Sequence, residues 1–211
     1  IASVWDTPTL SHYGDIDLAF AHLCASHDEY CGYFINAARA GRTVILDNGI
    51  MELGYAVDDS LLTEVVRLVR PAFVTTPEVL NDGAATLSLT REFVARMPQL
   101  RLPVETNLLG VVHGRSWGEW LDQYRTFHNE LDVVARIGIP YDLPFEVPGV
   151  SAAAYATNWE RMLCSRIRVV ELLDKAGLNR KPAHLLGIVD AIELVSQRRF
   201  PWIASNDSST A

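Results

Sequence analysis

The stretch VILDNGIMELGYAVDDSLLTEVVRLVRPAFVTTPE, residues 44–78, decides the fold class, because it combines two strand patterns with a helix between them. The apolar run 44–46 predicts a buried strand, and apolar residues recur at helical spacing after the capping sequence 58–60. Pro71 ends that helix, and the apolar run 72–74 predicts the next strand. Strands that alternate with helices indicate an α/β protein in which helices cover a parallel sheet.

The same alternation continues along the rest of the chain. Further strands are predicted at 108–112, 131–135, 183–188 and 202–204, and one more at Ser3, Val4 and Trp5. Helices are predicted at about 83–97, after Ser116, from Thr157 to about Lys175 and at 191–197, with a long loop at 140–156. Seven strand candidates favour a (β/α)8 TIM-type barrel, and an open doubly wound sheet is the alternative. We expect a single barrel domain over residues 1–211; because no eighth strand follows, either its C-terminal end is truncated or the barrel closes differently.

Composition narrows the class of protein. The 211 residues are 49% hydrophobic and 21% charged, which excludes a disordered, collagen-like or disulfide-stapled chain. No apolar run approaches the roughly 20 residues of a membrane span. The three cysteines form no CxxC pair, and the first residues show no secretory signal. We therefore expect a cytoplasmic protein, or one in the host cytoplasm if a virus encodes it.

Charge is distributed unevenly along the chain. The total is −8, yet residues 151–211 hold eight basic and six acidic residues and so carry +2, which leaves −10 for residues 1–150. An acidic protein does not suit non-specific nucleic-acid binding. A basic face in the last third could still contact phosphates, and the alternative is that these residues are simply solvated helix surface.

Several common functional motifs are absent from the sequence. It contains no phosphate-binding GxxxxGK[ST] loop, GxGxxG, HExxH or GxSxG, and its histidines and cysteines lack zinc-ligand spacing. No metal is therefore predicted in these residues. In a barrel the chemistry lies in the loops after the strands, and the residues that follow predicted strands are Asp47, Glu78, His113, Gly138 and Asp207. Topology predicts that they meet at one rim.

Taken singly, each of these side chains has an ordinary structural explanation. Asp47 suits a turn, Asp207 suits a helix cap, and Glu78 after Pro77 suits a helix start. His113 could be a buried hydrogen-bonded histidine. Considered alone, Met51 is expected to be a packing residue and His184 a structural residue.

Together, five strings carry a family resemblance. They are ILDNGIMELG (45–54), LLGVVHG (108–114), VARIGIP (134–140), HLLGI (184–188) and IASNDSSTA (203–211). In this order the set resembles the motif series of the tRNA-guanine transglycosylase superfamily. The compact DNG segment is most similar to the branch, encoded by phages and bacteria, that exchanges guanine in DNA for a 7-deazaguanine.

The resemblance implies two catalytic aspartates. Asp207 matches the nucleophile of the family, and Asp47 matches the aspartate that exchanges protons with the leaving and incoming bases. A nucleophilic carboxylate must be ionised, and Ser208, Ser209 or backbone N–H groups could hold Asp207 in that form. An apolar setting beside Leu46 and Met51 would raise the pKa of Asp47 and suit proton exchange.

The resemblance also implies substrate-binding residues. Glu78 stands near the position at which the family has an aspartate that reads the base. His113 stands at the position at which the family has a glutamine. Gly138 and Ile139 match a turn whose backbone contacts the base, and Met51 would cover one face of the base. This chain thus has histidine where the family has glutamine, and glutamate where the family has aspartate. Both differences affect which incoming base the site would accept.

The expected function is that of a pentosyltransferase, a glycosyltransferase that inserts a free 7-deazaguanine base such as preQ0 into DNA. The partners are then nucleic acid and the free base, with no membrane, and protein partners are a further option. No cofactor is expected within the chain, although the structural zinc of the family would bind beyond Ala211.

Three alternatives stay open. The same exchange could act on tRNA, or a non-catalytic barrel subunit could position a nucleic acid for a partner. An unrelated small-molecule barrel enzyme is the third, and Schiff-base chemistry is disfavoured for it because the two lysines, Lys175 and Lys181, stand in a helix and a loop.

Overall fold

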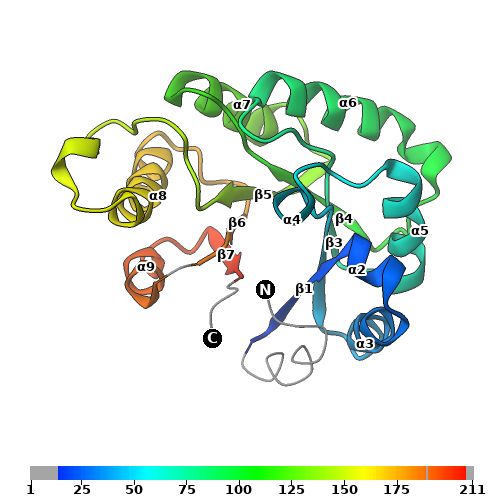
Figure 1. Cartoon of the computed structure of the whole chain (residues 1–211). Helices are drawn as coiled ribbons and strands as arrows, with labels where there is room; N and C mark the ends of the chain where they lie inside the picture. The colour runs from blue at the N-terminus through cyan, green and yellow to red at the C-terminus, as the bar shows by residue number, and fades with distance from the viewer. Residues whose placement is uncertain (1–13, 189, 208–211) are drawn as a thin grey trace.

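A computed structural model describes residues 14–188 and 190–207, and a parallel β-sheet forms its centre (Figure 1). In this part of the chain the sheet has seven strands, and each strand pairs with the next one in sequence. The strands are β1 (Ile16–Phe20), β2 (Thr43–Asp47), β3 (Phe73–Thr75), β4 (Asn107–Val111), β5 (Val134–Pro140), β6 (Ala183–Leu186) and β7 (Ile203–Asn206). The alternation of strands and helices predicted from the sequence is confirmed.

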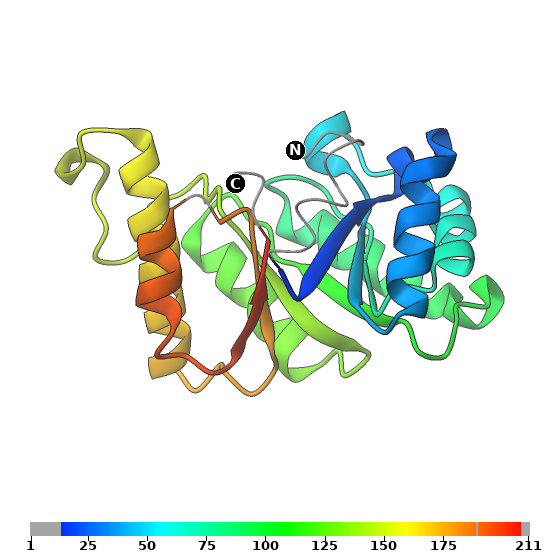
Figure 2. The same ribbon diagram turned by 90° about the horizontal axis from the view of Figure 1, so that it is seen from below.

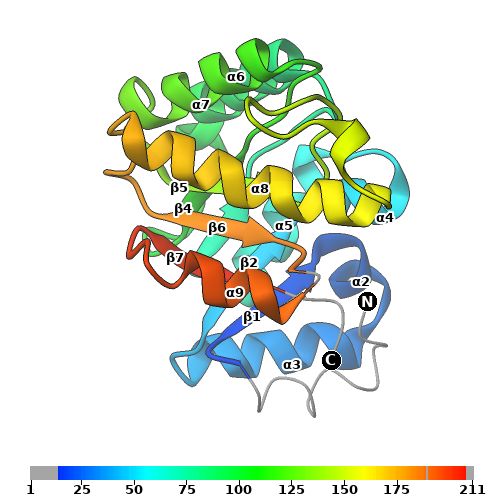
Figure 3. The same cartoon turned by 90° about the vertical axis from the view of Figure 1, so that its left-hand side faces the viewer.

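Helices flank this sheet, most of them on its outer face (Figures 1 and 3). They are α2 (Ala21–Ser26), α3 (Asp28–Arg39), α4 (Ile50–Leu53), α5 (Asp59–Val69), α6 (Gly83–Leu100), α7 (Trp117–Asn129), α8 (Asn158–Lys175) and α9 (Ala191–Gln197), with a 3-10 turn at Ala152–Ala154. Most of the predicted loop 140–156 lacks regular structure.

The sheet curls into a half-barrel, and its curl brings β7 toward β1 (Figures 2 and 3). Its strand order never reverses, whereas a doubly wound sheet reverses at a switch point, so that alternative is wrong. The described residues do not form a closed eight-stranded barrel, because β1 and β7 end the sheet and are not paired with each other. The predicted strand at Ser3, Val4 and Trp5 lies outside the described residues.

Side chains alternate between the two faces of each strand and so build two kinds of core. On the convex face, one apolar cluster joins Leu46 and Val74 to α2, α3, α5 and α6. A second cluster joins Ile137 and Leu185 to α7 and α8. The concave face carries a smaller cluster around Ile45, Leu109 and Val111. The remaining concave positions are therefore available for polar side chains.

The first elements of the described chain, β1 to α3, were not predicted from the sequence. Asp17 interrupts the apolar pattern of β1, and its buried carboxylate lies 2.6 Å from Arg42. Neither α2 nor α3 has a capping side chain at its N-terminus. The cap signals that located α5, α7 and α8 are absent there, and the short α4 was missed as well.

The predicted strand at 131–135 begins earlier in the sequence than the observed one. The run 131–135 was expected to form it, but β5 spans Val134–Pro140. Residues 132–133 form a turn instead. Gly138 and Ile139 therefore lie inside a strand.

Candidate active site at the carboxyl edge of the sheet

The carboxyl ends of the parallel strands gather four of the predicted site residues at one edge. Asp47 is the last residue of β2, and Asp207 directly follows β7. Glu78 and His113 lie in the segments after β3 and β4, and their side chains meet at 2.5 Å. This edge of the sheet is the candidate active site.

Asp47 is a buried carboxyl group among other acids. Its Oδ1 atom accepts a hydrogen bond of 2.7 Å from the backbone N–H of Gly49. Burial raises the pKa of Asp47 well above its usual range, and the charge of Glu78 raises it further. The charges of Glu52 and Asp207 add to this effect, so the two candidate catalytic aspartates lie within electrostatic reach of each other. Burial and these neighbouring charges all shift the equilibrium of Asp47 toward its neutral form.

Glu78 is held by two neighbouring side chains. Asn48 Nδ2 donates to Glu78 Oε1 at 2.8 Å, and His113 Nε2 lies 2.5 Å from Glu78 Oε2. All three side chains are buried. Each oxygen of the Glu78 carboxylate thus already has one hydrogen-bond partner. Glu78 can therefore bind a base only through the remaining lone pairs of these oxygens. Sequence reasoning missed Asn48, whose only signal was its place between Asp47 and Gly49.

His113 presents one ring nitrogen to its surroundings. A carboxylate accepts and does not donate, so the contact with Glu78 places a proton on Nε2 of the imidazole. The backbone N–H of His113 donates to Gln123 Oε1 at 2.6 Å and fixes the chain there. Among the described residues Nδ1 has no hydrogen-bond partner, and it is the atom left for a ligand.

Asp207 differs from Asp47 in its surroundings. Its side chain is 18% exposed, and its Oδ1 atom lies 3.0 Å from His184 Nε2 and 3.1 Å from the backbone N–H of Gly187. The residues expected to hold it, Ser208 and Ser209, lie outside the described residues. His184, considered alone, was assigned a structural role, yet it contacts the candidate nucleophile directly.

The remaining predicted substrate contacts are only partly supported. Gly138 and Ile139 do not form the expected turn: both belong to β5, and the carbonyl of Gly138 accepts from the N–H of Val112 at 3.1 Å. A side chain at Gly138 would meet Leu109 and Val111 at 3.0 Å, so glycine permits the strands to approach there. Met51 lies on α4 beside this edge and is 53% exposed.

The basic residues of the last third do not form one face at this edge. Arg166 is buried against Glu193, and Arg168 and Arg199 both bind Glu171. Lys181 donates to backbone carbonyl groups. Helices that follow parallel strands run back toward the opposite edge, so Lys175 at the end of α8 is remote from the site. Arg161 stands in the first turn of α8, and the contact of these basic residues with phosphates stays a prediction.

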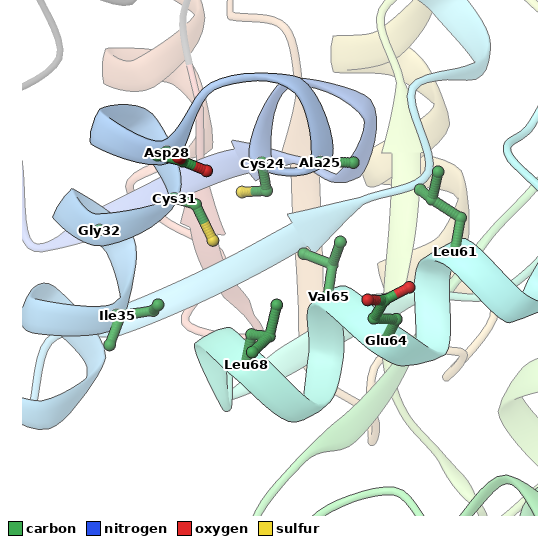
Figure 4. A pocket seen from close by; sticks show the side chains of 10 residues that line it. All are labelled: Cys24, Ala25, Asp28, Cys31, Gly32, Ile35, Leu61, Glu64, Val65 and Leu68. Carbon is green, nitrogen blue, oxygen red and sulfur yellow. The ribbon is translucent and has the colours of Figure 1, made fainter.

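A separate groove of about 380 Å³ lies on the convex side between α2, α3 and α5 (Figure 4). Cys24 and Cys31 line it, both are free thiols, and burial raises the pKa of each. Leu61, Val65 and Leu68 form the opposite wall. None of the predicted site residues lines this groove.

No protein-family model matches the chain, and a comparison with curated proteins finds no match. Within residues 14–188 and 190–207, no three His, Cys, Asp or Glu side chains are placed to share a metal ion. No helix in that part of the chain combines the length and apolar character needed to cross a membrane.

Proposed function

We propose that this protein is a base-exchange transglycosylase that replaces guanine in DNA with a 7-deazaguanine through a covalent aspartyl–sugar intermediate. The observation that carries the proposal is the contrast between two acids at one edge of the sheet. Asp47 is buried with a raised pKa, whereas Asp207 is partly exposed and receives two hydrogen bonds. Acids with separated environments suit a proton donor and a nucleophile.

In the first step a carboxylate oxygen of Asp207 attacks C1′ of the target nucleotide. The C1′–N9 bond breaks, and its electron pair leaves with the guanine. The neutral carboxyl group of Asp47 gives its proton to the departing base, which leaves uncharged. An ester then joins the sugar to Asp207, and Asp47 is ionised.

The second step repeats the first in reverse with a new base. N9 of the incoming 7-deazaguanine attacks C1′, the C1′–oxygen bond of the ester breaks, and Asp207 recovers its carboxylate. Asp47 takes the proton that the incoming base releases. One glycosidic bond replaces another, so the reaction needs no nucleotide energy source, in agreement with a sequence that contains no phosphate-binding loop.

Base selection falls to the buried trio of Asn48, Glu78 and His113 next to Asp47. A base placed there meets His113 through Nδ1, and the spare lone pairs of the Glu78 carboxylate face its donor groups. Met51 offers an apolar surface at the mouth of the site. A base in a duplex must leave the stack to reach this edge, which costs a few kcal/mol.

The resemblance of the compact DNG segment favours DNA over tRNA as the polymer. The proposal also includes a closed (β/α)8 barrel, in which an eighth strand would lie between β1 and β7.

Labelled guanine tests the function. The protein is incubated with the label and either duplex DNA or tRNA, and we expect exchange into DNA. Asp207→Ala should lower the rate by at least about 10³-fold, because the variant lacks the carboxylate that forms the ester with the sugar. The exposed Asp132→Ala variant, in the turn before β5 at the opposite edge, is the control and should exchange normally.

The polymer that carries the label identifies the substrate. Label in tRNA alone would select the tRNA alternative. Absence of label in both polymers, or full activity of Asp207→Ala, would overturn the mechanism.

A further inference from the structure

A chain of hydrogen bonds runs across the concave face of the sheet to Asp207. Arg136 on β5 donates from Nη1 to Ser205 Oγ at 2.8 Å, and Ser205 Oγ lies 2.8 Å from His184 Nδ1. His184 Nε2 then lies 3.0 Å from Asp207 Oδ1. His184 is fully buried, and the Arg136 guanidinium stacks over the ring of Phe73 at 4.0 Å. The residues come from three different strands and form one connected unit.

The groups at the two ends of this chain each have a single role in a hydrogen bond. A guanidinium can only donate, so Ser205 Oγ accepts from Arg136 and has its own proton available for His184 Nδ1. An ionised Asp207 can only accept, so His184 Nε2 carries a proton and donates it. One neutral tautomer of His184, with hydrogen on Nε2 and a bare Nδ1, satisfies both contacts at once.

The same contacts distinguish the two oxygens of Asp207. Oδ1 receives both His184 Nε2 and the backbone N–H of Gly187, and no donor among the described residues reaches Oδ2. An oxygen that receives two hydrogen bonds is the poorer nucleophile, because those bonds must weaken as its charge moves into a new bond. Oδ2 keeps its lone pairs available.

We propose that His184 is a positioning residue, which the relay from Arg136 through Ser205 holds in the Nε2–H tautomer so that Asp207 attacks with Oδ2. This inference rests on the proposed function, because it takes Asp207 as the ionised nucleophile. In the ester, Oδ2 is bonded to C1′ and Oδ1 becomes the carbonyl oxygen. The donors of His184 and Gly187 then stay on Oδ1 throughout the reaction.

Gln and Leu variants at position 184 separate positioning from packing. Leu removes the donor that holds the Asp207 carboxylate in place. We therefore expect His184→Leu to lower kcat by about 10²-fold, the loss expected when a nucleophile is misplaced. The KM for the free base should change by less than about twofold. A Gln amide can donate to Asp207 and accept from Ser205, and His184→Gln should recover at least about tenfold of that loss. His128→Leu is the matched control, since His128 is also buried but bonds the backbone of Arg180 at the opposite edge. It should leave kcat unchanged.

Nitrogen-15 NMR of the imidazole provides a readout that does not depend on activity. We expect the His184 signals of a neutral ring with hydrogen on Nε2 in the wild-type protein, and a mixture of tautomers in Ser205→Ala. A proton on Nδ1, a doubly protonated ring at neutral pH, or equal kcat values for folded His184→Leu and His184→Gln would overturn the inference. If the tautomer is as expected and the wild type exchanges no base, the proposed function fails and the arrangement of the relay stands.

Discussion

A carboxyl group that is buried on folding affects the stability of the protein as well as its chemistry. Burial and neighbouring acids raise the pKa of Asp47 above its ordinary value of 3.8, so the folded protein holds this proton more tightly than the unfolded chain does. Stability from this group is full below pH 3.8 and falls as the pH rises through the folded-state pKa. At neutral pH, where Asp47 is ionised in the unfolded chain, this group therefore opposes folding.

Asp47→Asn should therefore stabilise the protein at pH 8 while abolishing base exchange. Asn keeps an oxygen for the Gly49 N–H and carries no charge, and we expect a gain of about 0.5–2 kcal/mol in the free energy of unfolding. The gain should shrink toward pH 4. Urea unfolding at a series of pH values measures it, with the exposed Asp122→Asn as control. A gain that does not change with pH would contradict the assignment of a raised pKa to Asp47.

Gly187 offers a second test with a single residue. Its φ of +66° disfavours any side chain, and a Cβ atom would lie 2.8 Å from the ring of Tyr141. Gly187→Ala should cost about 1–3 kcal/mol and displace the N–H that binds Asp207, so the exchange rate should fall as well.

Gly177→Ala is the matched control for this variant. Gly177 has φ +70°, no atom lies within 4 Å of its added Cβ, and it follows α8 at the opposite edge. It should lose stability and keep the exchange rate, as measured by thermal unfolding and label incorporation. Equal loss of activity in both variants would show that strain alone is responsible.

At the scale of elements, a buried ion pair holds the turn between β6 and α9. Arg166 on α8 binds Glu193 on α9 and donates to the carbonyl groups of Leu186 and Gly187. Both charged side chains are at most 1% exposed. Three elements thus meet behind the N–H group that contacts Asp207.

Glu193→Gln should destabilise the protein by about 3–5 kcal/mol, because it leaves the guanidinium of Arg166 buried without its counter-charge. Arg199→Gln breaks an exposed pair with Glu171 and should cost less than about 1 kcal/mol. Urea midpoints of the two variants provide the measurement. Similar midpoints would mean that Arg166 finds water or another partner when Glu193 is changed.

The elements also show which parts of the fold a sequence can predict. The caps at Asp58, Ser116 and Thr157 located three helices, and a capping box forms at Thr157 and Glu160 as its spacing indicates. Glu119 has the same spacing from Ser116, but its carboxylate binds the N–H groups of Gly83 and Arg115. A local pattern specifies which groups could bond, and tertiary packing selects the partner.

The candidate site was predictable for the same topological reason as the sheet. Residues after parallel strands must gather at one edge, and Asp47, Glu78, His113 and Asp207 do so. His184 and Arg136 were not predictable, because they point inward from within strands and nothing in a single sequence says which concave residues meet. Arg136 lies on β5 and His184 on β6. These two strands pair so that Gly138, not Arg136, stands opposite His184.

At the scale of the whole molecule, the two candidate catalytic acids sit on very different strands. Asp47 ends β2, which pairs with neighbours on both sides, while Asp207 follows β7, which in the described chain pairs with β6 alone. An edge strand opens more easily than a central one. Amide hydrogen exchange should be faster at Ser205 in β7 than at Leu109 in β4.

Activity should accordingly be lost in less urea than the tertiary fold. Label incorporation and near-ultraviolet circular dichroism in the same urea series measure the two transitions. Coincident transitions, with equal protection of Ser205 and Leu109, would show that β7 opens only with the whole protein.

The place of Asp207 after the last described strand has a consequence during synthesis. A ribosome releases the part of the chain that carries Asp47 long before it releases residue 207. Under the proposed function, a nascent chain that ends before residue 207 lacks the group that breaks the bond to the sugar. Base exchange in DNA can then begin only after residue 207 has been synthesised, and incomplete chains cannot carry it out.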